Sequence, residues 1–187
     1  AFGLSERFDA PVLFHVTTRV CHSKGIVELG DREEHEYVPY KKQIEKYVSA
    51  PANAKKMRVN LETKLANMEA YANEIEINQP EWHSTKIGVV TSGISYQYAK
   101  ETFGEDASYL KLGMTFPLPT DLIKDFCSKV DKVYVIEEMD PYLQEFLEIH
   151  GIECIGNQQI PKFDELNTDI VREALTGVKP ESYESDL

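Results

Sequence analysis

Cysteine is scarce in this 187-residue sequence, and the spacing of the few cysteines excludes several kinds of site. Cys21, Cys127 and Cys154 lie far apart, and no two of them form a C-x-x-C pair. An odd number at such spacing argues against a disulfide framework and against a thiolate metal site. It also argues against an iron–sulfur cluster held by this chain alone, since such clusters need closely spaced cysteines. Unpaired cysteines are typical of a reducing compartment, so we expect a cytoplasmic protein.

The sequence also lacks long apolar runs and an excess of basic over acidic residues. No apolar run approaches the length of a membrane span. The opening residues have neither the basic region nor the apolar core of a signal peptide. The sequence starts with Ala1 rather than Met, so we expect a fragment or a processed product. The net charge of −12 disfavours nonspecific binding to nucleic acid or to an anionic membrane.

Motifs of self-sufficient active sites are absent from the sequence. There is no G-x-S-x-G nucleophile elbow, and the five histidines show no H-E-x-x-H or comparable spacing. Gly30-Asp31 lacks the second glycine and the asparagine of the magnesium–diphosphate motif of thiamine enzymes. His35 lies in an acidic run, which predicts a solvated segment rather than a metal site. With 42% hydrophobic and 28% charged residues, the chain is long enough to bury a core.

The stretch that organises the chain is 86–98. Its apolar, β-branched residues predict a buried strand over 87–91, and Gly93 permits a tight turn with positive φ into a helix. Such a turn aims N–H groups and the positive end of a helix dipole at one point, which makes a possible anion seat. A purely structural turn is the favoured alternative, because the glycine pattern is neither G-x-G-x-x-G nor a Walker loop. The residues of the possible anion seat, three of which could also cap the helix, are Thr91, Ser92, Gly93 and Ser95.

The sequence of the first half of the chain predicts fewer helices and strands. β-Branched and aromatic residues predict a strand from Val12 to Thr18, followed by polar residues at the edge where α/β sheets form sites. Residues 28–51 are charged and irregular. Apolar residues spaced by three and four predict a long helix over 52–77 with one apolar stripe along it. We expect this stripe to pack on its own domain, with pairing to a partner helix as the alternative.

From residue 86 onward, strands and helices alternate through short loops. This order predicts βαβ units and a parallel sheet covered by helices on both faces. Asp140, followed by a proline, predicts a helix cap. Glu137 and Glu138 are neighbours on a strand and point to opposite faces, which disfavours an acid–base pair. The remaining predicted strands are 107–112, 132–137 and 152–155, and the predicted helices are 94–103, 120–130, 141–150 and 167–175.

Five phrases, taken together and in order, resemble a known family: the large (α) subunit of indolepyruvate ferredoxin oxidoreductase, a thiamine-diphosphate 2-oxoacid oxidoreductase. The resemblance covers nearly the whole chain. The phrases are SERFDAPV at 5–12, TTRVCHSKG at 17–25, GVVTSGISY at 88–96, LGMTFPLP at 112–119 and VIEEMDPYL at 135–143.

The resemblance implies an internal piece of an α/β protein. The implied fold is a parallel-sheet βαβ domain of the transketolase C-terminal-like type, preceded by a long helix and by a piece of a second thiamine-binding-type domain. The implied parts are the end of a pyrimidine-binding thiamine domain at 1–27, a connector with the long helix at 28–85, the transketolase C-terminal-like domain at 86–177 and an acidic tail at 178–187.

The resemblance also implies a function. The family oxidatively decarboxylates aryl 2-oxoacids such as indolepyruvate to acyl-CoA and passes electrons to ferredoxin. The full enzyme would use thiamine diphosphate, magnesium and 4Fe-4S clusters, with the rest of the α chain and a β subunit as partners. This piece would hold none of these cofactors, contain no catalytic residue, and serve assembly without being active itself. The alternative is a free-standing small-ligand or nucleotide-binding α/β module.

The polar phrase near the start of the chain matches the family at the edge of the pyrimidine domain. An active-site-edge or interface role is implied there, with a solvated loop as the alternative. Cys21 stands where the family phrase has a serine. The residues with the implied edge role are Thr17, Thr18, Arg19 and His22.

Overall fold

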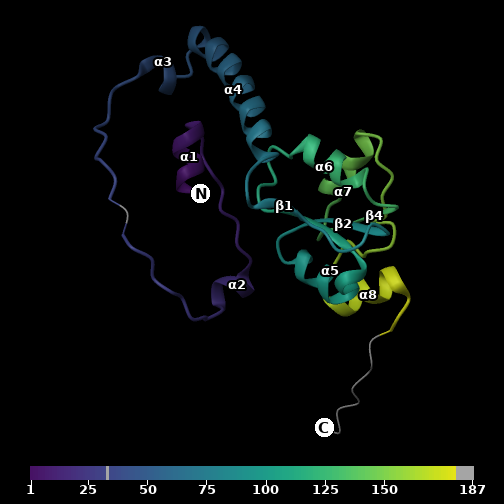
Figure 1. The fold of residues 1–187 in the computed structure, drawn as a ribbon. Coiled ribbons are helices and arrows are strands. Elements are labelled where there is room, and N and C mark those ends of the chain that lie inside the picture. The colour runs from purple at the N-terminus through teal and green to yellow at the C-terminus, as the bar shows by residue number, and fades with distance from the viewer. Residues whose placement is uncertain (33, 180–187) are drawn as a thin grey trace. The chain divides into compact units, whose positions relative to one another are not determined.

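The computed structural model describes residues 1–32 and 34–179 of the chain. The backbone divides into two compact units, Ala1–Lys64 and Leu65–Leu187, and each is described by itself (Figure 1). Most of the predicted acidic tail, from Pro180 onward, lies outside the described residues. Within the described part of the chain, no helix combines the length and the hydropathy that crossing a membrane requires.

The first unit consists of short helices joined by irregular chain. The helices are α1 (Phe2–Phe8), α2 (Thr18–His22), α3 (Ile44–Tyr47) and the first part of α4 (Pro51–Ala72). The strand predicted from Val12 to Thr18 is wrong: residues 11–17 form neither helix nor strand, and Thr18 begins α2. β-Branched residues form a strand only where another strand pairs with them, and the described part of this unit offers none.

The long helix predicted over 52–77 is confirmed, but it ends earlier. Helix α4 ends at Ala72, which is buried. The side chain of Asn78 donates to the carbonyl of Ala72 at 3.0 Å and so satisfies one of the free carbonyls at the end of the helix. The chain then turns into a strand that the sequence did not predict, β1 (Asn78–Glu81).

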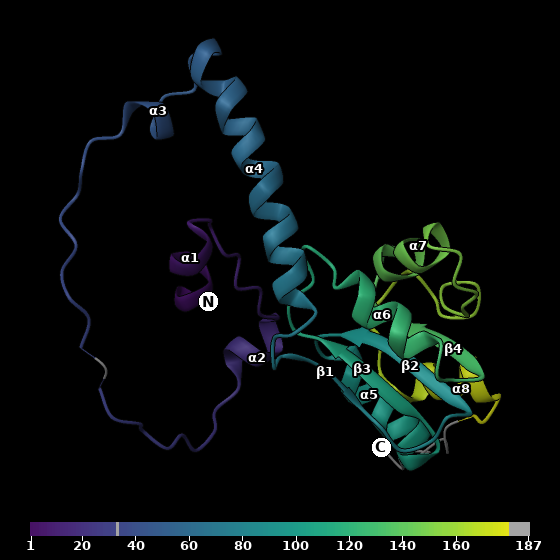
Figure 2. The same cartoon turned by 45° about the horizontal axis from the view of Figure 1, so that its top comes forward.

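The second unit is built on a four-stranded sheet with the order β1-β3-β2-β4 (Figure 2). The three parallel strands are those predicted: β2 (Ile87–Ser92), β3 (Ser108–Leu112) and β4 (Lys132–Ile136). The prediction of a wholly parallel sheet is wrong at one edge, because β1 runs antiparallel to β3. Pro80 lies in this edge strand, where a residue without an N–H is tolerated. The strand predicted over 152–155 is reduced to one parallel bridge between Ile155 and Tyr134.

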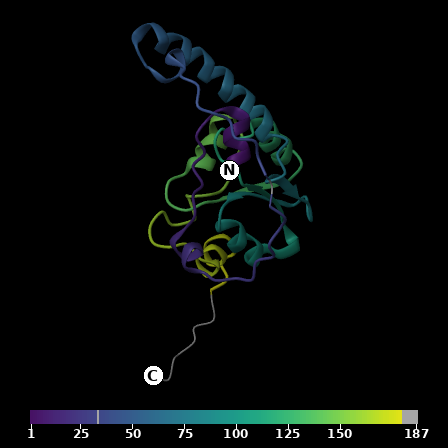
Figure 3. The same ribbon diagram turned by 90° about the vertical axis from the view of Figure 1, so that its left-hand side faces the viewer.

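Helices cover both faces of this sheet, as predicted (Figure 1 and Figure 3). Helices α6 (Thr120–Cys127) and α7 (Tyr142–Ile149) pack on the face that carries Val90, Leu110 and Val135. Helices α5 (Ser95–Phe103) and α8 (Thr168–Thr176) pack on the face that carries Val89 and Ile136. Successive residues of a strand point to opposite faces of the sheet, and because both faces are covered, β2 is buried from Gly88 to Thr91.

Candidate functional site

Three loops begin at the same edge of the sheet. Ser92 pairs with Leu112, and Thr91 pairs with Ile136, so β2, β3 and β4 end side by side. This carboxyl edge is where open α/β sheets place their ligands. It is therefore the first place at which to look for a site in the second unit.

The turn after β2 is built differently from the prediction. Gly93 has the expected positive φ of 57°. Thr91, however, is fully buried, and its hydroxyl donates to the carbonyl of Ile136 at 2.7 Å, which ties β2 to the end of β4. The N-cap position of α5 is Ile94, which has no side-chain cap, so the predicted capping by Thr91, Ser92 or Ser95 is wrong. Ser95 is buried, whereas Gly93 is exposed. The anion seat stays a prediction.

Asn78 organises the loop after β3. Its side-chain oxygen accepts hydrogen bonds from the backbone N–H groups of Gly113 and Met114, both at 2.8 Å. Its amide donates to the carbonyls of Met114 and Ala72. A single buried side chain thus joins the end of α4, strand β1 and the loop.

The loop after β4 is held by Glu137. This carboxylate is buried, and its two oxygens accept from the backbone N–H groups of Leu143 (2.8 Å) and Gln144 (3.0 Å) in the first turn of α7. Burial raises the pKa of Glu137, and the two backbone hydrogen bonds partly offset this rise. The predicted cap, Asp140, is wrong: Pro141 occupies the N-cap position, and Glu137 takes over the side-chain role from the end of the strand.

Replacing Glu137 by alanine is expected to destabilise the chain by about 1–3 kcal/mol, because two backbone N–H groups lose their acceptor and stay partly buried. Urea unfolding measures this loss. The matched control is Glu138→Ala, one residue along and less buried, which is expected to stay within about 0.5 kcal/mol of the parent chain. Equal losses in the two variants would show that the capping role is wrong.

Apolar side chains stand exposed at the carboxyl edge. Phe116 and Met139 are each 69% exposed and Tyr142 is 48% exposed. Phe116 and Met139 come from the loops after β3 and β4, and Tyr142 is the first residue of α7. The Tyr142 hydroxyl connects the two regions by donating to the carbonyl of Thr115 at 2.9 Å. The carboxylate of Glu137 already accepts two backbone hydrogen bonds and is not free for catalysis. The composition of this edge therefore favours a surface for contact with another protein part over an active site.

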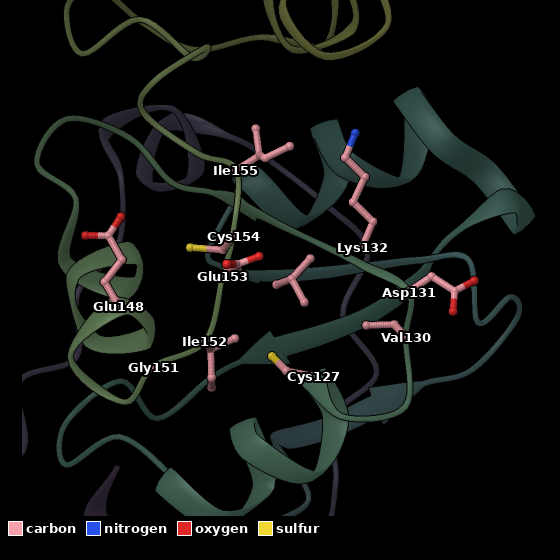
Figure 4. A pocket seen from close by; sticks show the side chains of 11 residues that line it. Cys127, Val130, Asp131, Lys132, Glu148, Gly151, Ile152, Glu153, Cys154 and Ile155 are labelled. Carbon is pink, nitrogen blue, oxygen red and sulfur yellow. The ribbon is translucent and has the colours of Figure 1, made fainter.

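A hollow elsewhere in this unit contains two cysteines (Figure 4). It has a volume of about 730 Å³ and lies between the start of β4 and residues 151–155. Burial raises the pKa of Cys127 to about 12 and that of Cys154 to about 11, so both are neutral thiols at pH 7. A neutral thiol is a poor nucleophile, and the described residues contain no group of three or more His, Cys, Asp or Glu that could hold a metal ion.

The polar residues singled out near the start of the chain lie on the surface of the first unit. Thr18, Arg19 and His22 belong to α2, and Thr17 is its N-cap without a side-chain cap bond. All four are exposed. They occupy a short helix instead of the end of a strand, because the strand predicted before them does not form. Their active-site-edge role stays a prediction.

A polar cluster that the sequence did not predict joins β1 to α5. Glu81 accepts from the Lys100 ammonium (2.7 Å) and from the Tyr96 hydroxyl (2.5 Å), and His83 Nε2 lies 2.8 Å from its carboxylate. Lys100, then Tyr96 and His83, lower the pKa of Glu81 to about 2. The partners lie up to 19 residues apart in sequence, which is why no local pattern indicated the cluster.

The Glu81 cluster is expected to make the second unit sensitive to acid. A carboxylate with a lowered pKa stabilises the fold above its ordinary pKa of 4.5 and loses that contribution as the pH falls towards about 2. Glu81→Gln is therefore expected to flatten the loss of stability across this range, measured by urea unfolding at several pH values. The control is the exposed Glu105→Gln. A slope that Glu81→Gln leaves unchanged would contradict the assignment.

Comparison with known proteins gives a consistent set of relatives, although no family model matches. Subunit IorA of indolepyruvate oxidoreductase from Methanothermobacter thermautotrophicus is 36% identical over 192 residues, which cover 95% of this chain and 31% of the subunit. The IorA of Archaeoglobus fulgidus is 35% identical, covering 96% of the chain and 30% of the subunit. The IorA of Pyrococcus horikoshii is 29% identical, covering 94% and 30%.

Among solved structures, a 2-oxoglutarate:ferredoxin oxidoreductase from Magnetococcus marinus matches with a TM-score of 0.46 and 18% identity. The match covers 57% of this chain and 20% of that one, and the score is too low to establish a shared fold. The sequence relatives are informative on their own, since their similarity runs along almost the whole chain while the chain spans about a third of their length. The chain is therefore a homologue of one segment of the indolepyruvate oxidoreductase subunit IorA.

Proposed function

We propose that the chain is part of the large subunit of an enzyme that oxidatively decarboxylates indolepyruvate and related aryl 2-oxoacids. The substrate carboxylate leaves as carbon dioxide, the acyl group forms a thioester with CoA, and the electron pair passes to ferredoxin. The observation that carries this proposal is the identity of 36% to an indolepyruvate oxidoreductase subunit along 95% of the chain.

Within that enzyme, we assign to this segment an assembly role. The second unit corresponds to a transketolase C-terminal-like domain, an assignment that its three parallel strands and two helical layers support. Thr91 and Glu137 at the carboxyl edge are engaged internally, and apolar side chains from the neighbouring loops are exposed. An edge of this composition fits contact with another domain or subunit.

The described residues do not fit the cofactors of such an enzyme. Iron–sulfur clusters are held by closely grouped cysteines, whereas Cys21, Cys127 and Cys154 lie far apart in sequence, and the part of the chain that the structure describes contains no group of three or more His, Cys, Asp or Glu that could hold a metal ion. We place thiamine diphosphate, magnesium and the 4Fe-4S clusters in the rest of the subunit and in a β subunit, together with the contacts to CoA and ferredoxin. This segment then contributes surfaces and spacing to the assembled enzyme, in a cytoplasmic compartment.

An assay of the assembled enzyme tests the reaction. The full-length subunit, purified with its β partner under anaerobic conditions, is expected to reduce ferredoxin when supplied with indolepyruvate and CoA. Omission of CoA is the internal control for thioester formation. Ferredoxin reduction with 2-oxoglutarate but not with indolepyruvate would contradict the proposed substrate, and reduction with neither would contradict the proposed activity.

A further inference from the structure

A groove runs through the first unit between α3 and the middle of α4. It has a volume of about 1150 Å³, and its lining includes residues from 43–49, from 54–64 and Asp9. Asp9 ends α1 and forms ion pairs with Lys46 of α3 and Lys64 of α4. These pairs connect the elements that form the walls, so the groove is a built feature of the first unit.

Apolar side chains from both helices line the groove. Met57 and Leu61 lie one turn apart on α4 and therefore share a face of the helix, and α3 contributes Ile44 and Tyr47. Leu61 is 44% exposed and Ile44 is 54% exposed, so the described residues of the chain leave much of this apolar surface uncovered. The sequence predicts that the apolar stripe of α4 packs on its own domain. This holds for Ala72, which is buried, and fails for Leu61, which is exposed. Two apolar helix faces flanking a groove match the way in which proteins bind an amphipathic helix.

The charge around this surface has the sign opposite to that of the chain. The chain has a net charge of −12, yet the groove is lined by an excess of two positive charges. Two lysines share the single carboxylate of Asp9, and Lys56 lies 3.8 Å from Glu45 in a loose, exposed pair. The basic lining residues are Lys46, Lys56, Arg58 and Lys64, and the acidic ones are Asp9 and Glu45.

We propose that the α3–α4 groove binds an acidic amphipathic helix of a partner polypeptide. The apolar face of that helix would cover Met57 and Leu61, and its flanking carboxylates would meet the lysines on the walls. A nucleic acid would satisfy the basic side chains but not the apolar ones, so the combination favours a polypeptide. This inference concerns assembly and holds whichever 2-oxoacid the enzyme uses.

Binding of two defined peptides tests the proposal. One probe is a fluorescein-labelled helix of about 14 residues, with leucines spaced by three and four and glutamates elsewhere; this length spans the α4 part of the groove, residues 54–64, and extends slightly beyond it. The other probe has lysine in place of every glutamate. Fluorescence anisotropy with the 187-residue chain is expected to show saturable binding of the glutamate peptide, weakened by added salt, and none of the lysine peptide.

Matched variants of α4 locate the binding. Lys56 lines the groove, whereas its neighbour Lys55 does not, and both are exposed. Lys56→Glu is expected to weaken binding of the glutamate peptide about tenfold, and Lys55→Glu less than about twofold. Circular dichroism verifies that both variants keep their helix content, and Lys56→Gln provides a milder variant. The proposal is overturned by equal binding of both peptides, by no binding of the glutamate peptide, or by equal effects at the two lysines.

Discussion

Phe126→Ala is expected to lower the free energy of unfolding of the second unit by about 3–5 kcal/mol. Phe126 is fully buried on α6, and its ring centroid lies 5.0 Å from that of Trp82. It also fills the space over Gly88, where an added Cβ would lie only 3.1 Å from the ring and 2.7 Å from Val130. Because helix and strand approach so closely here, the neighbours have little room to collapse into the cavity that alanine leaves.

Urea unfolding measures this loss, with the fluorescence of Trp82 as the signal because it is the only tryptophan of the chain. The control is Phe163→Ala, which removes the same ring from a position that is 74% exposed and is expected to change stability by less than about 0.5 kcal/mol. Circular dichroism provides a second signal that does not depend on the contact between Trp82 and Phe126. A loss at Phe126 no larger than that at Phe163 would contradict the described core.

Asn78→Ala is expected to cost about 2–4 kcal/mol and to loosen the loop after β3. The variant removes the Asn78 oxygen that accepts from the Met114 N–H, and one of the two acceptors of the Gly113 N–H, which keeps the carbonyl of Ile77 at 3.0 Å. It also removes the donor to the carbonyl of Ala72. Buried polar groups left without a partner lose the free energy of solvation that they had in the unfolded chain. The loss is therefore expected to be local and largest at Met114, because Gly113 keeps the Ile77 carbonyl as an acceptor.

Hydrogen exchange measures the local part of this effect. The Met114 amide is expected to exchange faster in Asn78→Ala, and more so than the Gly113 amide, which keeps the Ile77 carbonyl as its acceptor. Amides in β4 are expected to change only as much as the global stability does. The matched control is Asn67→Ala on the exposed side of α4, where alanine is expected to stabilise the helix slightly. Unchanged exchange at Met114 in Asn78→Ala would show that the loop does not depend on this side chain.

The parts of the fold that could be predicted are those in which local pattern and tertiary structure agree. Strand β2 is apolar from Ile87 to Val90 because both of its faces are covered, and Gly93 follows because the turn needs a positive φ. Helix α4 followed from apolar residues at helical spacing. The residue at which α4 ends did not follow from this spacing. It depends on Asn78, which lies beyond the helix and whose side chain donates a hydrogen bond to the carbonyl of Ala72.

The remaining features depend on contacts that no local pattern contains. Asp140 followed by proline is a good cap signal, but Glu137 reaches the same backbone N–H groups from the end of a strand. The carboxylate of Glu81 accepts from two residues of α5, Tyr96 and Lys100, which lie 15 and 19 residues further along the chain. The residues from Val12 onward have strand propensity, yet propensity alone does not form a strand without a neighbour to pair with. Sequence phrases therefore identified the relatives, whereas the arrangement of the site required the structure.

Calorimetric titration of the 187-residue chain is the most direct test of its assignment as an assembly segment rather than a free-standing ligand-binding module. The chain is titrated in turn with thiamine diphosphate and magnesium, with CoA and with ATP, using a preparation that circular dichroism shows to be folded. The assembly role predicts no saturable heat with any of them, because Thr91 and Glu137 at the carboxyl edge are already engaged by the fold itself. Saturable binding of ATP at micromolar concentration, with one site per chain, would contradict it.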